Sequence, residues 1–181
     1  MTVVSVIGAG LAGSEAAWQL AERGVSVRLM EMRPQVTTPA HETGHFAELV
    51  CSNSLGSNLE SAAGGLLKKE LEVMDSLILR VAKETQVPAG GALAVDRGLF
   101  ASEVTKRLMA HPLVEVVNEE CVEIPSGVVV IATGPLTSPA FAGVLQNVTQ
   151  SDNLYFFDAA APIVLGESIN YEKGFWAARC G

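Results

Sequence analysis

The sequence predicts an α/β fold with a parallel β-sheet at its centre, and three observations support this prediction. A β-branched run over residues 3–7 gives way to a glycine-rich turn and then to a helical pattern. A second apolar run over residues 25–30 follows that helix directly. A third run, over residues 128–131, has the continuous apolar character of a strand buried in a parallel sheet. Strand, helix and strand in this order form a βαβ unit.

The turn after the first strand carries the pattern Gly-x-Gly-x-x-Gly in residues 8–13. Gly8 permits a tight turn, Gly10 lets a pyrophosphate approach the backbone, and Gly13 lets the helix pack closely on the sheet. The second strand ends at Glu31, whose carboxylate is placed to accept hydrogen bonds from an adenosine ribose. The stretch therefore predicts a dinucleotide site. Its expected binding residues are Gly8, Ala9, Gly10, Leu11, Ala12, Gly13 and Glu31.

The next part of the chain is expected to combine a long loop with helices. Residues 32–63 are polar and lack periodicity, and a loop this long in a compact domain usually has a function. An amphipathic helix is expected from about Gly65 to Lys83, with Lys68 on its solvated face. A turn-rich connector over residues 87–92 leads to a second helix, which Asp96 is placed to cap.

Short strands are expected after the second helix. Residues 113–117 and 121–124 fit a hairpin or consecutive edge strands, and Cys121 then belongs to the core. Residues 154–157 and 162–165 fit further strands.

The apolar run over residues 128–131 ends in Ala132, Thr133 and Gly134. Small residues after such a strand let the chain pass close to a cofactor. Together with the βαβ unit, this favours FAD over a free nicotinamide dinucleotide. Thr133 and Gly134 are therefore expected to join the cofactor-binding residues.

Composition excludes several classes of protein. The net charge is −8, with 20 acidic against 12 basic residues, which argues against extensive nucleic-acid contact by this chain alone. No apolar run is long enough for a membrane helix, and the chain opens with a strand rather than a secretory leader. The three cysteines, at positions 51, 121 and 180, are too scattered for a disulfide framework. A cytoplasmic location without membrane attachment is the expectation.

Two motifs in the long loop bear on chemistry. His41 and His45 flank Glu42 in the zinc-protease pattern, but no apolar stripe would hold that segment as a helix, so no metal site is predicted. Cys51 stands among small polar residues in the same loop. It fits a thiolate nucleophile or a flavin neighbour, and equally a small, buried, inert cysteine; spacing alone leaves both open.

Several blocks of this sequence recur in one family. They cover residues 6–18, 31–34, 38–41, 50–54, 87–97, 132–137 and 158–164. Together they resemble the folate- and FAD-dependent tRNA (uracil-5-)-methyltransferases, the TrmFO family. The Cys-Ser-Asn-Ser block at 51–54 and the Pro-Ala-Gly-Gly-Ala-Leu-Ala-Val-Asp-Arg block at 88–97 are far more specific than the glycine pattern.

The resemblance implies a function and its co-substrates. FAD, reduced by NADPH or NADH, takes a one-carbon unit from 5,10-methylenetetrahydrofolate and passes it to C5 of a T-loop uridine in tRNA. Uracil C5 becomes nucleophilic when a thiolate adds to C6. Cys51 matches the family's Cys-Ser-Asn-Ser motif and so inherits a catalytic or flavin-proximal role. The implied partners are tRNA and the folate, and the oligomeric state stays open.

The resemblance also implies an organisation. Family members are more than twice as long, so residues 1–181 are expected to be the N-terminal part of an FAD-binding domain. That domain is a Rossmann-like three-layer fold, here truncated, with an inserted functional loop and helical region at about 32–110. Two competing hypotheses are a non-catalytic FAD-binding fragment and an FAD-dependent tRNA wobble-uridine modification protein. The block at 51–54 speaks against the second.

Overall fold

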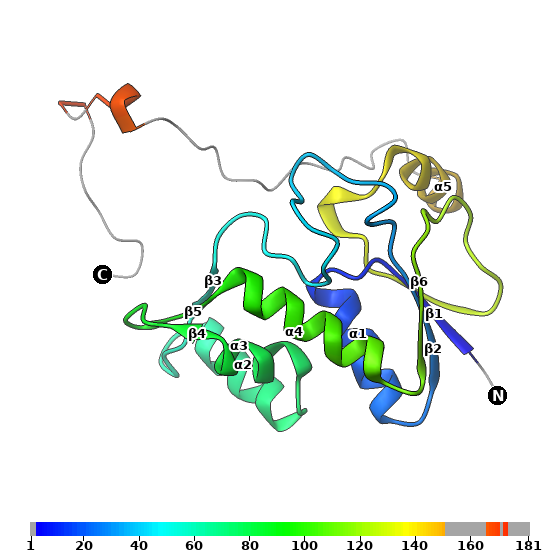
Figure 1. Cartoon of the computed structure of the whole chain (residues 1–181), viewed down its shortest axis with the longest axis horizontal. Helices are drawn as coiled ribbons and strands as arrows, with labels where there is room; N and C mark the ends of the chain where they lie inside the picture. The colour runs from blue at the N-terminus through cyan, green and yellow to red at the C-terminus, as the bar shows by residue number, and fades with distance from the viewer. Residues whose placement is uncertain (1–2, 151–165, 171, 174–181) are drawn as a thin grey trace.

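The computed structural model describes residues 3–150, 166–170 and 172–173 of the chain. Its centre is a sheet with strand order β6-β2-β1-β7, in which every neighbouring pair is parallel (Figure 1). The strands are β1 (Val3–Ile7), β2 (Ser26–Met30), β6 (Val114–Val117) and β7 (Val128–Ile131). The predicted parallel central sheet is confirmed.

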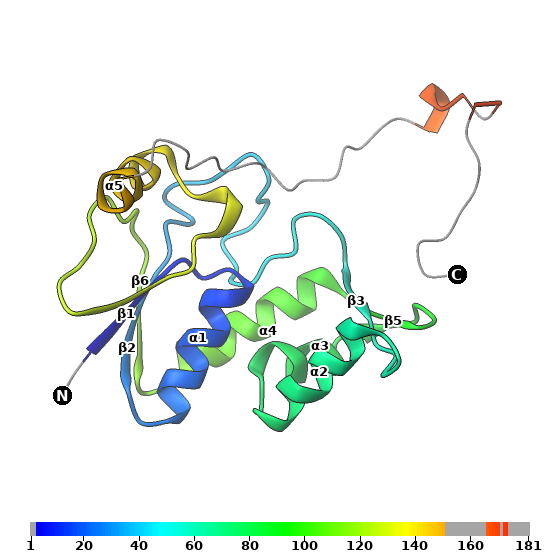
Figure 2. The ribbon, with the colours of Figure 1, turned by 180° about the vertical axis from the view of Figure 1, so that it is seen from behind.

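Helices lie on both faces of this sheet. The helices of the described residues are α1 (Leu11–Glu22), α2 (Ala63–Val73), α3 (Leu77–Glu84), α4 (Arg97–Ala110) and α5 (Pro139–Thr149). Of these, α2 packs on α3 and β3 rather than on this sheet. Successive strand residues point to opposite faces. Val6 and Leu29 accordingly enter a core with residues of α1, α3 and α4, whereas Ile7 and Met30 enter a second core with Phe141 of α5. Figure 2 shows α5 well apart from α1 and α4. The result is the expected three-layer arrangement.

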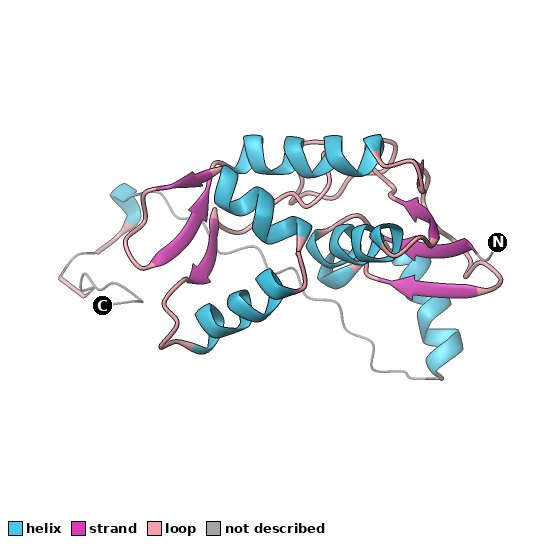
Figure 3. Ribbon diagram, turned by 90° about the horizontal axis from the view of Figure 1, so that it is seen from below, coloured by secondary structure: helices cyan, strands magenta, loops and turns pink. Residues whose placement is uncertain are grey.

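A second, antiparallel sheet lies at the other end of the molecule (Figure 3). It has the order β3-β5-β4, with β3 (Ser54–Ser57), β4 (Gln86–Val87) and β5 (Ala92–Val95). The sequence predicted only a connector over residues 87–92. Strands of two and four residues around a Pro-Ala-Gly-Gly turn are too short to show a period, and their pairing with β3 is long-range.

The predicted single helix from Gly65 to Lys83 is wrong, because two helices, α2 and α3, fill this region. Asp75 adopts a left-handed conformation (φ 57°), which ends α2. The Ser76 side chain then accepts a hydrogen bond from the Leu79 backbone and caps α3. Local capping thus overrides a continuous apolar pattern.

Lys68 is buried, which contradicts its predicted place on a solvated face. Its ammonium group donates to the Ser57 carbonyl at 2.8 Å and to the Gly64 carbonyl at 3.2 Å. The bond to Ser57 joins α2 to the end of β3, and the bond to Gly64 lies within α2. Burial lowers the pKa of Lys68 from its usual value.

The Asp96 cap is confirmed, since its carboxylate accepts a hydrogen bond from the Leu99 backbone at 2.9 Å. The apolar face of α4 is buried through Phe100, Val104 and Leu108.

Two predictions about the later strands need correction. Residues 121–124 form no strand and no hairpin; they belong to an irregular segment after β6. β7 is parallel as predicted but only partly buried, because it is an edge strand, with Val128 55% and Ile131 43% exposed. The strands predicted over 154–157 and 162–165 lie outside the described residues. Within the described part of the chain, no helix has the length and apolar character needed to cross a bilayer.

Candidate functional site

The glycine turn is fixed by contacts within the protein at two of its three glycines. Gly8 has a positive φ of 94°, and a Cβ there would lie 2.8 Å from the Ala132 carbonyl oxygen. A Cβ on Gly13 would overlap the Gly8 carbonyl oxygen, which is a backbone atom that cannot rotate away. Both positions therefore need glycine for the fold itself, as the close packing of helix and strand predicts.

Gly10 differs from these two glycines. A Cβ at Gly10 would meet no protein atom within 4 Å, and its φ of −69° is open to any residue. The packing of this chain does not require glycine there. The open space lies at the start of α1, where the backbone N–H groups and the positive end of the helix dipole favour an anion. This is the space that a pyrophosphate needs.

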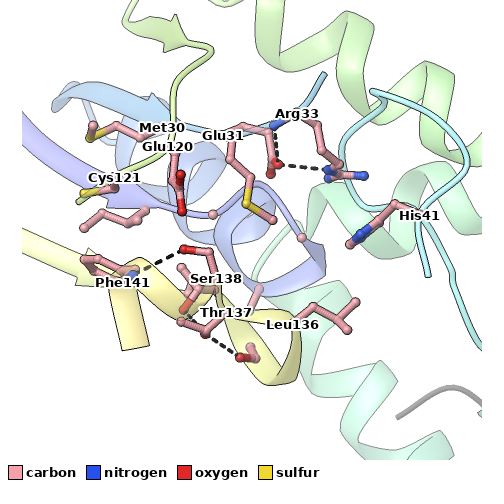
Figure 4. A pocket seen from close by; sticks show the side chains of 18 of the residues that line it. Met30, Glu31, Arg33, His41, Glu120, Cys121, Leu136, Thr137, Ser138 and Phe141 are labelled. Atoms are coloured by element: carbon pink, nitrogen blue, oxygen red, sulfur yellow. Dashed lines mark hydrogen bonds and ion pairs between the residues drawn. The ribbon is translucent and has the colours of Figure 1, made fainter. Parts of the chain in front are cut away.

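The space belongs to a cleft of about 310 Å³. Seven of the predicted cofactor residues line it: Gly8, Gly10, Leu11, Ala12, Glu31, Thr133 and Gly134. Ala9 and Gly13 are buried behind the lining. The fold therefore brings the predicted residues from β1, β2 and the segment after β7 together in one site (Figure 4).

Glu31 is buried, 5% exposed, and both of its carboxylate oxygens accept hydrogen bonds. Oε2 accepts from the Ala9 backbone at 2.8 Å. Oε1 accepts from Arg33, from Nε at 2.8 Å and from the backbone at 3.1 Å. Burial acts to raise the pKa of Glu31, but the Arg33 side chain and the backbone donors outweigh it and hold the pKa below its usual value. The carboxylate is thus fixed in its charged form beside the cleft.

Arg33 was not singled out by the sequence reasoning. Its guanidinium is 2% exposed and also donates to Glu48 Oε2 at 3.0 Å. Glu48 in turn accepts hydrogen bonds from the backbones of Glu42, at 2.9 Å, and Thr43, at 3.3 Å. Arg33 therefore links Glu48 of the long loop to Glu31 at the end of β2. No local pattern shows this link, because it depends on where the folded loop places Glu48.

The segment after β7 forms the opposite wall of the cleft. Gly134 has a φ of 63° and begins the short 3₁₀ turn Gly134–Leu136. The Thr133 and Thr137 hydroxyl groups share a hydrogen bond of 2.6 Å, and the Thr137 hydroxyl also donates to the Gly134 carbonyl at 2.7 Å. The backbone here bends around the cleft, in keeping with the predicted role of these small residues.

One end of the cleft is apolar. Ile7, Met30, Cys121 and Phe141 gather there from both strands, the segment after β6 and α5 (Figure 4). The prediction that Cys121 belongs to the core is confirmed, but its place in the cleft wall was not foreseen. Burial raises the pKa of its thiol, which donates to the Glu123 carbonyl at 2.9 Å. The thiol is therefore kept protonated, and the end of the cleft suits a flat apolar group.

Cys51 is exposed and does not line this cleft, although the preceding Val50 does. The alternative of a small, buried, inert cysteine is therefore wrong. Ser52 and Asn53 line an open hollow beside Asp96 and Arg97 of the α4 start. Cys51 thus stands between the cleft and that hollow. Cys180 lies outside the described residues.

The zinc-protease pattern does not form a helix, because residues 41–45 belong to the loop. His41 lines the cleft, whereas His45 lines a separate hollow next to Arg97. The described residues contain no group of three side chains of the metal-ligating types placed to hold an ion.

Comparison with known proteins now adds to this geometry. A family model described as glucose inhibited division protein A matches residues 3–180. The chain belongs to this family. It is 64% identical over 181 residues to methylenetetrahydrofolate--tRNA-(uracil-5-)-methyltransferase TrmFO of Carboxydothermus hydrogenoformans, covering 99% of this chain and 42% of that protein. It is 58% identical over 176 residues to the protein of the same name from Bacillus subtilis (strain 168), covering 97% of this chain and 40% of the relative.

These relatives confirm the resemblance to TrmFO. The chain spans 40–42% of the length of the curated relatives it matches. Among solved structures, it is similar to the Aquifex aeolicus GidA structure in its form II crystal, with a TM-score of 0.58 and 18% identity over 73% of this chain and 25% of that one. This likeness supports the Rossmann-type fold.

Proposed function

We propose that this chain is the FAD-binding part of a methylenetetrahydrofolate–tRNA (uracil-5-)-methyltransferase. The observation that carries the proposal is the open space at Gly10, between the start of α1 and the buried Glu31 carboxylate. The names of relatives at 58–64% identity support the reaction. The proposed domain is the N-terminal part of an FAD-binding domain over residues 1–181, with the region at about 32–110 inserted in it.

The proposed cofactor contacts follow from the fold. Leu11 and Ala12 line the cleft at the start of α1, where their backbone N–H groups and the helix dipole would hold the pyrophosphate. The fixed Glu31 carboxylate would accept hydrogen bonds from the adenosine ribose. Thr133 and Gly134 present backbone rather than bulky side chains to the cofactor. When bound, FAD reduced by NAD(P)H would supply a carrier for the one-carbon unit and a hydride.

Cys51 is the proposed catalytic residue. A thiolate adds to C6 of uracil, so that a sulfur–carbon bond forms and the electron pair moves through C5 onto the C4 oxygen, making C5 nucleophilic. The exposure of Cys51 gives a nucleotide of tRNA access to it. A position beside the flavin is the second possible role, and the Cys51 thiol stands one residue from the cleft wall.

The proposed partners are tRNA and 5,10-methylenetetrahydrofolate. A net charge of −8 is poorly suited to tRNA binding. We therefore place most of the tRNA surface in the part of the relatives that this chain does not span. Three scattered cysteines fit a reducing cytoplasm as the proposed location.

Flavin binding and methyl transfer test the proposal separately. The purified chain is titrated with FAD, and methyl incorporation into tRNA is assayed with labelled methylenetetrahydrofolate and NADPH. Saturable FAD binding with incorporation supports the whole proposal. Binding without incorporation limits this chain to the cofactor part and favours the FAD-binding fragment. No binding of FAD contradicts the proposal.

Cys51→Ala is the matched variant. Because Cys51 lies outside the cleft lining, FAD affinity should change by no more than a few-fold, while any methyl transfer is lost. Methyl transfer that persists in this variant would exclude Cys51 as the catalytic residue.

A further inference from the structure

The cleft carries an excess of acidic side chains, although the proposed FAD is itself an anion. Among the described residues, four carboxylates line it: Glu31, Glu48, Glu119 and Glu120. The pyrophosphate of a dinucleotide carries two further negative charges. In the same described lining, Arg33 is the only lysine or arginine, and its guanidinium is buried and already paired with two of the carboxylates. An anion in this cleft would therefore gain affinity from another positive charge besides the α1 dipole.

His41 is the remaining side chain of the described lining that can become a cation. It is half-buried, and its imidazole projects toward the cleft from the loop wall opposite Met30 and Cys121 (Figure 4). Its Nδ1 lies 2.7 Å from the Thr38 hydroxyl oxygen. Within the described part of the chain, Nε2 has no hydrogen-bond partner.

The bond to Thr38 suits both states of the ring. A hydroxyl group donates to Nδ1 of a neutral imidazole, and it accepts from Nδ1–H of an imidazolium after rotating its proton. Protonation of His41 therefore keeps this bond, places the added proton on Nδ1, and gives the Nε2–H donor, which both states have, a positive charge behind it. Because Thr38 occupies Nδ1, the nitrogen that is free to contact a bound group is Nε2.

The surroundings keep His41 neutral near pH 7 when no anion lies beside it. Burial lowers its pKa below the usual value, and the Arg33 charge adds to this effect. Glu48 and Glu31 act in the opposite direction but do not outweigh it. A pyrophosphate beside Nε2 would raise the pKa, because an adjacent negative charge favours the imidazolium.

We propose that His41 is a cofactor-contacting residue: its Nε2 donates a hydrogen bond to the pyrophosphate of bound FAD, and FAD binding takes up a proton at this ring. The inference rests on the proposed function, since it assumes FAD in this cleft. It goes beyond that function by making cofactor affinity depend on pH through one named side chain.

The direction of the effect follows from linkage. The pKa of His41 is higher with FAD bound than without it, so affinity is greatest below the free-state pKa and falls as pH rises through the bound-state pKa. The size of the fall in affinity is set by the difference between these two pKa values. We expect FAD to bind about tenfold more weakly at pH 8.5 than at pH 6.

Calorimetric titration of the chain with FAD tests this, in buffers of different ionisation enthalpy near pH 7. Wild type should take up a fraction of one proton per FAD. His41→Gln keeps an acceptor for the Thr38 hydroxyl but cannot become charged, so its proton uptake should vanish and its affinity should vary less than about twofold over the same range. His45→Gln is the matched control from the same loop, outside the cleft, and should behave as wild type.

The outcomes separate the inference from the proposed function. FAD binding without proton uptake in wild type, or proton uptake that persists in His41→Gln, overturns the role of His41 and leaves the FAD site standing. Absence of FAD binding at every pH overturns both. If His41→Gln fails to fold, the role of His41 is still overturned by absence of proton uptake in wild type, or by loss of this uptake in His45→Gln.

Discussion

The glycine turn at residues 8–13 and the segment around Cys51 differ in what holds them in place. The turn is fixed by backbone contacts between Gly8, Gly13 and Ala132, and by the bond from Ala9 to Glu31. The Cys51 thiol is exposed, and the segment that carries it is attached by hydrogen bonds between Asn53 and Val95 of β5. The walls of the cofactor cleft are therefore built by this chain's own packing. The thiol, by contrast, is presented to groups outside it.

Arg33 connects the two regions, so its replacement should have the largest effect. Arg33→Met would leave the Glu31 and Glu48 carboxylates without their buried partner. We expect a loss of about 3–5 kcal/mol in the free energy of unfolding, measured by urea denaturation. Arg28→Met is the matched control, because Arg28 and Glu115 form an exposed pair, and it should cost less than about 1 kcal/mol. Equal losses of stability in the two variants would contradict a stabilising role for the buried Arg33–Glu31 and Arg33–Glu48 ion pairs.

Low pH should weaken the same two ion pairs of Arg33. The pKa values of Glu31 and Glu48 both lie below the ordinary value of 4.5. Their contribution to stability is therefore complete above the unfolded-state pKa and is lost as pH falls through the lower folded-state values. Urea denaturation at a series of pH values below about 5 should show a steeper loss for wild type than for Glu31→Gln. If the free energy of unfolding falls equally with pH in the two proteins, Glu31 does not contribute to the pH dependence of stability.

The three glycines of the turn should respond differently to alanine. Gly13→Ala forces a Cβ against the Gly8 carbonyl and should cost about 3 kcal/mol of stability, visible as a lower midpoint of thermal unfolding. Gly10→Ala meets no protein atom, so the midpoint should stay unchanged while FAD affinity falls. Similar midpoints for the two variants would contradict the assignment of Gly10 to the cofactor.

Cys51→Ala should have the smallest effect on stability. The thiol is exposed, so its removal should change the free energy of unfolding by less than about 0.5 kcal/mol. Chemical denaturation of this variant beside Cys121→Ala makes the comparison, since Cys121 is buried in the second core. A large destabilisation by Cys51→Ala would mean that the segment is held by packing, and the contrast with the glycine turn would fail.

The predictable part of the fold is local in sequence. The βαβ unit, the Glu31 position and the Asp96 cap follow from short patterns whose geometry is fixed by a few neighbouring residues. The break between α2 and α3 at Asp75 depends on a cap that competes with a continuous apolar stripe. The β3-β5-β4 sheet depends on pairing across the chain, which no local period reveals.

The same division applies to the site. Seven predicted cofactor residues line one cleft, because the glycine pattern and the strand ends encode its walls directly. Arg33, Glu48 and His41 were missed as site residues. Their roles arise only when the long loop folds back on the glycine turn, as the bond from the Ala47 backbone to the Ala9 carbonyl shows.

Fluorescence titration of the purified chain with FAD, run beside Gly10→Ala, tests the central claim most directly. We predict saturable binding to wild type and at least about tenfold weaker binding to Gly10→Ala at an unchanged unfolding midpoint, because the added methyl group occupies the space of the pyrophosphate. No saturable binding by wild type, or equal affinity in the two proteins, would contradict the assignment of this cleft to FAD.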